Sequence, residues 1–137
     1  MIHVIGLGFV GLTTLLGFAS KGFDVVGVET SSLRLNTLKN NKIPFKEPNL
    51  EKILRKQKNI IFSKKLIKLK NKNNFFFICV GTPNKKNGSQ DLDQIFVAIN
   101  NIVKSVKNIC KNNIIIIKST VLPGTINKLE KIYKSKN

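Results

Sequence analysis

The chain of 137 residues is long enough for one domain with its own core, and its hydrophobic fraction of 42% argues against disorder. Its longest apolar run, residues 75–80, is far shorter than the roughly 20 residues that cross a bilayer, and no charged segment leads into an apolar one at the start, so we expect neither a membrane span nor a signal peptide. The formal net charge of +17 makes nucleic acid one candidate partner.

Two hydrophobic patterns alternate along the chain. Runs of consecutive β-branched and aromatic residues are typical of strands buried on both faces, whereas apolar residues three and four positions apart are typical of helices. In chain order, these patterns predict a strand at 2–6, a helix at 9–21, a strand at 24–28, a helix capped by 31–32, a helix starting at 50, a strand at 59–62, a weak helix at 66–70, a strand ending in a loop at 73–83, a helix at 92–107, a strand ending in a loop at 112–120 and a helix at 125–133.

The order of these elements indicates the fold class. Strands that are continuous apolar runs, and that alternate with helices, are typical of a parallel sheet covered on both faces. We therefore predict an α/β fold, a Rossmann-like doubly wound parallel sheet with helices on both faces. The chain has no internal repeat, low-complexity linker or clear boundary, so residues 1–137 are expected to form one domain.

The stretch from Gly6 to Gly11 has the pattern G-x-G-x-x-G, which is weak evidence by itself. Its context is that of a dinucleotide-binding loop, because a predicted strand precedes it, a predicted helix follows it, and Glu29 ends the next strand eighteen residues after Gly11. Gly6 would allow the turn off the strand, Gly8 would let a pyrophosphate approach the backbone, and Gly11 would let the helix pack closely on the sheet. The N–H groups at the helix start would bind the phosphates.

Glu29 is the candidate ligand for the adenosine ribose, because its carboxylate can accept hydrogen bonds from both ribose hydroxyls. A carboxylate at this point repels the 2′-phosphate of NADP, which favours NAD. Arg34 lies nearby in the sequence, and an arginine at such a point is how some sites accept that phosphate. Since Glu29 would have to move aside for the phosphate, we predict NAD as the cofactor.

The remaining reactive groups give weaker signals. The lysines are scattered along the chain without interleaved aromatic residues, which favours a compositional bias over a nucleic-acid partner. Cys79 and Cys110 lie in apolar surroundings and are expected to be inert core thiols, Cys79 within a buried strand, which indicates a reduced, cytoplasmic protein. His3, on the first strand, is expected to be structural.

Four segments carry a family resemblance: "GLGFVGL", "VGVETSSLRLNTLKNNKIPFKEPNL", "FFFICVGTPNKKNGSQDLD" and "IIIIKSTVLPGT". In this order and spacing they resemble the N-terminal domain of the UDP-glucose/GDP-mannose dehydrogenase family, from Met1 to about Thr125. The resemblance implies oxidation of the sugar 6-hydroxyl of UDP-glucose or GDP-mannose to a carboxylate, with two NAD molecules in succession. The β-hydroxyacid dehydrogenases share a similar glycine loop, but they usually have Met at the position of Val10 and lack the "EPNL" and "VGTP" segments.

The resemblance also implies which residues hold the cofactor. The glycine loop would bind the pyrophosphate, Glu29 the adenosine ribose, and the loops that follow two later strands would close over the nicotinamide end. Glu29 stands where the family usually has Asp, and Asn49 stands where it usually has Gly, so a turn with positive φ is expected at Asn49. The implied cofactor-binding residues are Gly6, Leu7, Gly8, Phe9, Val10, Gly11, Glu29, Arg34, Val80, Gly81, Thr82, Pro83, Ser119 and Thr120.

In the family that the chain resembles, the catalytic machinery lies beyond the position of Asn137. It consists of a thiolate with lysine, aspartate and glutamate partners, and neither cysteine of this chain matches the setting of that thiolate. We therefore expect no catalytic residue and no metal site here, but the cofactor half of a longer, homo-oligomeric enzyme that contacts its nucleotide sugar through the other half. The alternatives are a stand-alone NAD-binding regulatory module, the N-terminal domain of a β-hydroxyacid dehydrogenase, and a basic nucleic-acid-binding module, whose affinity for oligonucleotides would fall steeply with salt.

Overall fold

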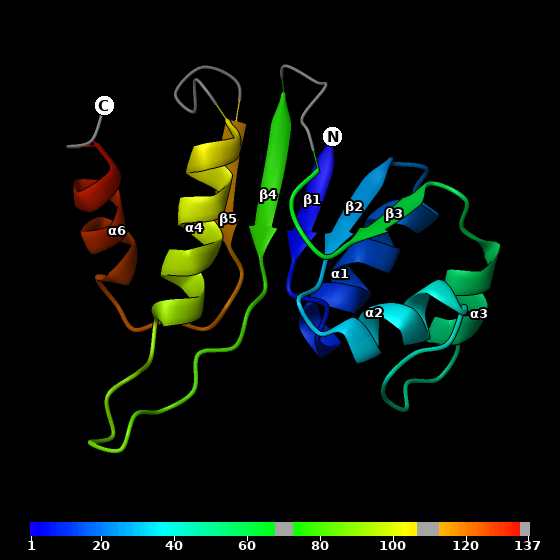
Figure 1. Ribbon diagram of the computed structural model, residues 1–137, viewed down its shortest axis with the longest axis horizontal. Coiled ribbons are helices and arrows are strands. Elements are labelled where there is room, and N and C mark those ends of the chain that lie inside the picture. Colours follow the sequence, from blue (N-terminus) through cyan, green and yellow to red (C-terminus); the bar gives the residue numbers. More distant parts are fainter. Residues whose placement is uncertain (68–72, 107–112, 135–137) are drawn as a thin grey trace.

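The computed structural model describes residues 1–67, 73–106 and 113–134 (Figure 1). The strands are β1 (Ile2–Ile5), β2 (Val25–Val28), β3 (Ile60–Ser63), β4 (Asn74–Ile78) and β5 (Asn113–Ile117). The helices are α1 (Phe9–Ser20), α2 (Ser32–Lys39), α3 (Leu50–Lys56), α4 (Asp93–Ser105) and α6 (Thr125–Lys134).

The strands form one parallel sheet in the order β3-β2-β1-β4-β5. The chain moves outward from β1 to β3, and then crosses back to place β4 on the other side of β1. The order therefore reverses between β1 and β4, and ligands of open α/β sheets bind outside the carboxyl ends of the strands at such a point. This topology confirms the predicted doubly wound fold.

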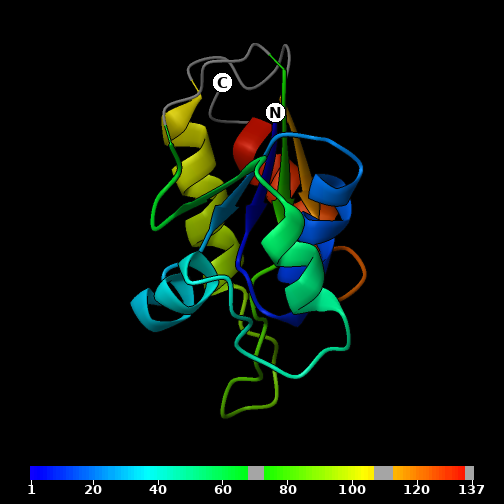
Figure 2. The same cartoon turned by 90° about the vertical axis from the view of Figure 1, so that its right-hand side faces the viewer.

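Each face of the sheet has its own hydrophobic core. Helices α1 and α3 lie on one face and α4 on the other, as Figure 2 shows. Successive side chains along a strand point to opposite faces of the sheet, so each strand contributes to both cores. Val4 packs in the core beneath α1 and α3, whereas Ile5 packs in the core beneath α4. Leu129 of α6 joins the second core, and Tyr133 donates a hydrogen bond of 2.9 Å from its hydroxyl to Asn100 of α4. The core beneath α4 thus extends to the far edge of the sheet.

Three of the expected elements differ from the structure. Strand β4 ends at Ile78, because β1 turns away at Gly6 and the N–H of Cys79 makes the last bond to β1, at 2.8 Å to the Ile5 carbonyl. Cys79 therefore lies after the strand and is half-buried, and its expected place within a buried strand is wrong. The weak helix expected at 66–70 is not helical at 66–67, and its remaining residues lie outside the described ones. Helix α4 ends at Ser105, and position 107 also lies outside them.

Asn49, immediately before α3, has a φ of 65° and a ψ of −10°, which is the left-handed region. This is the turn that the sequence predicted where asparagine replaces the usual glycine. Asparagine visits this region at a lower cost than most residues with a Cβ. The short helix that follows buries Leu50 and Leu54 against α1, so the turn orients a helix that contributes to the core.

Among the residues that the structure describes, no helix is both long and apolar enough to cross a membrane.

Candidate functional site

The glycine loop joins β1 to α1 at the carboxyl end of the sheet, and two of its glycines are required by packing. Gly6 has a φ of +87°, and a Cβ there would lie 2.9 Å from the Cys79 carbonyl oxygen. A Cβ on Gly11 would overlap the Gly6 carbonyl oxygen, so the helix start rests directly on the loop. Gly8 differs, because a Cβ there would have no heavy atom within 4 Å and its φ of −69° suits any residue. The fold alone does not require glycine at position 8.

Glu29 follows β2 and turns back towards the glycine loop. Its side chain is 6% exposed, and its carboxylate accepts three hydrogen bonds: Oε1 from the Ser31 N–H at 2.8 Å, and Oε2 from the Leu7 N–H and from Nη1 of Arg34, each at 3.1 Å. Burial acts to raise the pKa of Glu29, but the bonds from Ser31, Arg34 and Leu7 outweigh it and hold the pKa below its ordinary value. An ionised carboxylate therefore connects the glycine loop to the start of α2.

A cavity of about 1030 Å³ opens beside these groups, between the strand ends and α4. It brings together six of the sequence-predicted residues, which come from the loops after β1, β2 and β4 and from α2: Gly6, Gly8, Glu29, Arg34, Val80 and Gly81. Cavity residues that sequence reasoning missed include Lys64, Lys65, Asp93, Gln94, Asn101 and Lys104. Lys64 and Lys65 had a usable signal, because they directly follow β3 and the ends of parallel strands meet at one edge. The cavity residues on α4 gave no such signal in the sequence, because their position depends on how that helix packs on the sheet.

The loops after β4 and β5 are tied to each other and do not line the cavity beyond Gly81. The hydroxyl of Ser119 donates to the Val80 carbonyl at 2.7 Å, and that of Thr82 donates to the Thr120 carbonyl at 3.0 Å. Pro83 is exposed beside them. These predicted residues therefore fix the path of the two loops at the switch point.

The other side chains of the glycine loop, those of Leu7, Phe9 and Val10, are not among the residues that line the cavity. The Leu7 side chain is buried in the core, and only its N–H reaches Glu29. Phe9 and Val10 are 54% and 47% exposed at the start of α1, and the Phe9 ring lies 5.2 Å from the ring of Phe45.

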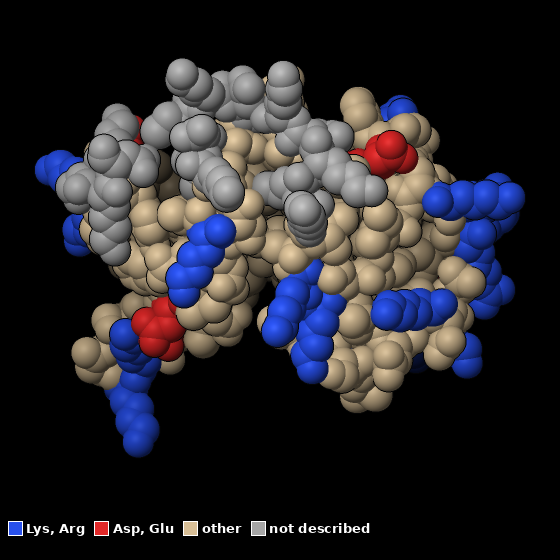
Figure 3. All heavy atoms as spheres, turned by 45° about the horizontal axis from the view of Figure 1, so that its top comes forward, with Lys and Arg blue, Asp and Glu red and all other residues tan. Residues whose placement is uncertain are grey.

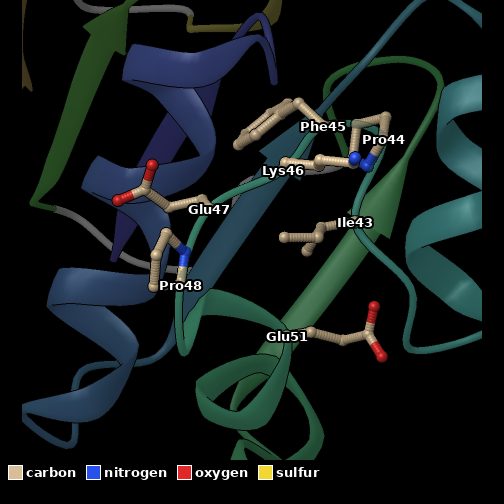
Figure 4. Close-up of a pocket in the computed structure, with 7 residues that line it drawn as sticks. All are labelled: Ile43, Pro44, Phe45, Lys46, Glu47, Pro48 and Glu51. Atoms are coloured by element: carbon tan, nitrogen blue, oxygen red, sulfur yellow. The ribbon is translucent and has the colours of Figure 1, made fainter.

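Phe45 belongs to a second, shallower hollow of about 650 Å³ on the segment between α2 and α3 (Figure 4). In the close-up, Phe45 and Glu47 point towards α1, whereas Glu51 points away from it. The hollow has none of the glycine loop in its lining, which consists of Ile43, Pro44, Phe45, Lys46, Glu47, Pro48 and Glu51. We therefore place the candidate site in the larger cavity.

Neither Cys79 nor His3 lies in a setting that suits covalent or metal chemistry. Burial raises the pKa of the Cys79 thiol to about 11, although Lys118 acts in the opposite direction, so the thiol is protonated and inert at neutral pH. His3 is fully buried, stacked on Phe76, with Nε2 3.4 Å from Oδ1 of Asn74. No group of three or more His, Cys, Asp or Glu side chains within the described ranges could hold a metal. Cys110 lies outside those ranges.

Positive charge is widespread on the surface. Figure 3 shows lysine and arginine side chains in several separate places on one face, with few acidic side chains between them. They do not gather there into a single patch.

The sheet order, the glycine loop and the acidic residue after β2 together define a dinucleotide-binding domain of the Rossmann type. Comparison with known proteins makes the assignment more specific: residues 1–137 match the UDP-glucose/GDP-mannose dehydrogenase family, NAD binding domain, and the chain belongs to this family. The match over the whole chain favours this family over the β-hydroxyacid dehydrogenases.

Three relatives illustrate the similarity. The chain is 34% identical to GDP-mannose 6-dehydrogenase of Pseudomonas aeruginosa over 135 residues, 93% of this chain and 30% of the relative. It is 38% identical to UDP-N-acetyl-D-mannosamine dehydrogenase of Methanococcus maripaludis over 142 residues, 99% of this chain and 31% of the relative. A solved structure of UDP-D-ManNAc dehydrogenase from Pyrococcus horikoshii superposes with a TM-score of 0.87 at 30% identity, covering 98% of this chain and 32% of the other. The chain thus spans less than a third of these relatives.

Proposed function

We propose that residues 1–137 are the N-terminal, NAD-binding part of a nucleotide-sugar 6-dehydrogenase, which oxidises the sugar 6-hydroxyl to a carboxylate. The observation that carries the proposal is Gly8. It lies between two glycines that packing requires and lines the same cavity as Glu29, and yet a Cβ at Gly8 would meet only open space. A pyrophosphate that approaches the backbone gives a physical reason for glycine at this position.

In this proposal, Gly6–Gly11 hold the pyrophosphate through N–H groups at the start of α1, and Glu29 holds the adenosine ribose. An ionised carboxylate has about four acceptor positions, and three of those of Glu29 are already used. Glu29 therefore accepts one ribose hydroxyl with Arg34 in place, and it accepts both only when Arg34 withdraws. Arg34 lies on the adenosine side of the site.

The nicotinamide end would lie at the loops after β4 and β5. Val80–Pro83 and Ser119–Thr120 would border it, and the hydrogen bonds between these loops keep them together before the cofactor arrives. When bound, NAD supplies a hydride acceptor. The contribution of this chain is to hold and orient that acceptor, since the catalytic thiolate and its partners belong to the rest of the enzyme that the resemblance implies.

Three nucleotide sugars are candidates for the substrate. Relatives are named for GDP-mannose and for UDP-N-acetyl-D-mannosamine, and the family description adds UDP-glucose. Because the sugar contacts would come mostly from the other half of the enzyme, we keep GDP-mannose and UDP-glucose as the proposed substrates and treat the N-acetylated sugar as a third candidate to be assayed.

We further propose that the full-length enzyme is a cytoplasmic homo-oligomer that supplies uronic acids for polysaccharide synthesis and does not bind nucleic acid. A free thiol at Cys79 fits a reducing compartment, and on the face that Figure 3 shows the lysine and arginine side chains lie in separate places rather than in one patch.

Calorimetric titration of the chain with NAD and with NADP tests the proposal. We expect NAD to bind more than about tenfold tighter, because the ionised Glu29 opposes the 2′-phosphate. Tighter binding of NADP, or no binding of either cofactor to the folded chain, would contradict it.

A further inference from the structure

The segment between β4 and α4 carries positive charge that the proposed cofactor site does not use. We propose that residues 84–90 form a basic hairpin whose two lysines, Lys85 and Lys86, bind the diphosphate of the nucleotide sugar. The inference rests on the proposed function and adds to it a substrate contact that this domain makes.

The basic hairpin has a defined backbone. An antiparallel bridge joins its two ends. The Lys85 N–H donates to the Ser89 carbonyl at 2.7 Å, and the Gly88 N–H donates to the Lys85 carbonyl at 2.9 Å. Gly88 has a φ of +79°, which is typical of a three-residue hairpin loop that ends in a left-handed glycine. Lys86 therefore lies in the turn at the tip of the hairpin, and Lys85 comes directly before it.

The base of the hairpin is anchored on the nicotinamide side of the proposed site. The Gln90 side chain donates from Nε2 to the Thr120 carbonyl at 2.8 Å, and its Oε1 accepts from the Leu122 N–H at 3.2 Å. The Asp91 N–H donates to the Pro83 carbonyl at 2.8 Å. Pro83 and Thr120 are among the residues proposed to border the nicotinamide. The hairpin would therefore begin beside the place where the sugar is oxidised.

The hairpin also extends in a suitable direction. It projects past the carboxyl ends of the strands, at the same edge of the sheet as the glycine loop, in Figure 1 and in Figure 2. During hydride transfer the sugar carbon lies about 3–3.5 Å from the nicotinamide, and the diphosphate is one sugar ring away from that carbon. A hairpin arm of three residues spans about 10 Å, and a lysine adds a flexible four-carbon stem. The two lysines can therefore reach the diphosphate.

The charge of the hairpin fits such a ligand. Residues 84–90 contain two cations and no carboxylate, and both lysines are exposed. Neither lysine forms an ion pair with a carboxylate in the part of the chain that the structure describes. An ammonium binds phosphate as a point charge, so it needs no fixed fork geometry. Two neighbouring ammonium groups thus match the two negative charges of a nucleotide-sugar diphosphate.

Amide NMR of the isotopically labelled chain, saturated with NAD, tests the inference, because NAD then fills the glycine loop. Titration with GDP-mannose and with UDP-glucose should shift the amide signals of residues 84–90. Inorganic pyrophosphate should shift the same signals, whereas free mannose, which lacks a diphosphate, should leave them unchanged.

Variants of the two lysines test their part in binding. Lys85→Ala combined with Lys86→Ala should weaken the binding of both nucleotide sugars by about tenfold or more, because charge-assisted hydrogen bonds are lost. Lys85→Arg combined with Lys86→Arg keeps both charges and should retain most of the affinity. Lys58→Ala is the matched control, since Lys58 is exposed and precedes β3, at the opposite edge of the sheet. NAD affinity should stay the same in all of them.

The inference is overturned if neither nucleotide sugar changes the signals of residues 84–90, or if pyrophosphate alone does so. Equal affinities in the double alanine variant and in Lys58→Ala overturn it as well. If the native chain binds no NAD, the proposed function has failed, and the same titrations without NAD still decide whether the hairpin binds a diphosphate.

Discussion

At the scale of single residues, Gly8 separates the needs of the fold from those of the ligand. We predict that Gly8→Val loses more than about tenfold in NAD affinity, because the added side chain fills the space proposed for the pyrophosphate. Valine is a poorer helix N-cap than glycine, so a cost of about 1 kcal/mol in stability is expected as well. Gly17→Val, at an exposed position of α1 where a Cβ would have no heavy atom within 4 Å, is the control that should bind NAD normally. Binding isotherms and melting curves of both variants measure the affinity and the stability. Normal NAD affinity in a folded Gly8→Val variant would show that the glycine loop is only a turn and does not bind the pyrophosphate.

His3 gives a second prediction at this scale. Burial lowers the pKa of His3, the hydrogen bond with Asn74 opposes this, and the N-terminal charge adds to it. The unfolded chain therefore takes up this proton at a higher pH than the folded one, so stability is lost as the pH falls below about 6.5. We expect a slope of up to about 1.4 kcal/mol per pH unit, and a flat profile for His3→Gln in urea titrations between pH 7 and 5.5. The same slope in both proteins would assign the effect to other groups.

At the scale of elements, the turn before α3 depends on which residue stands at position 49. Asn49→Ala should destabilise the chain by about 1 kcal/mol, because a φ of 65° has a higher conformational free energy for alanine than for asparagine. Asn49→Gly should change the stability little. Asn40→Ala is a control with an ordinary φ of −86°, and urea denaturation compares the three. An equal loss in Asn49→Ala and Asn40→Ala would show that backbone conformation at Asn49 is not the cause.

Local sequence patterns were sufficient to predict the type and order of most helices and strands, because apolar runs and helical spacing involve residues that are close in the sequence. The predictions failed where the structure depends on contacts between residues that are far apart in the sequence. The end of β4 is set by the turn of β1 at Gly6, so Cys79 could not be placed from its own apolar surroundings. Likewise, the sequence predicted Glu29 and Arg34 as neighbours of the cofactor, but not that Glu29 binds the glycine loop itself. The contact of Lys64 with α2 depends on the pairing of β2 with β3, which is also non-local.

At the scale of the whole molecule, the chain is an NAD-binding domain that spans less than a third of its relatives. We predict that it binds NAD but does not oxidise UDP-glucose, GDP-mannose or UDP-N-acetyl-D-mannosamine. Oxidation needs the sugar carbon held about 3–3.5 Å from the acceptor atom, and the proposed sugar contacts lie in the other half of the enzyme. The assay follows the absorbance of reduced nicotinamide with each sugar in excess. Turnover that disappears in Cys79→Ser or Cys110→Ser would instead place a catalytic thiol in this domain.

We expect NAD to occupy the cavity at the switch point of the sheet. Amide NMR spectra of the isotopically labelled chain, recorded during titration with NAD, test it most directly. We expect the largest changes in amide chemical shift at Gly6–Gly11, at Glu29–Ser31 and at Val80–Gly81. Shifts centred on the hollow at 43–51, or an unchanged spectrum at saturating NAD, would contradict it.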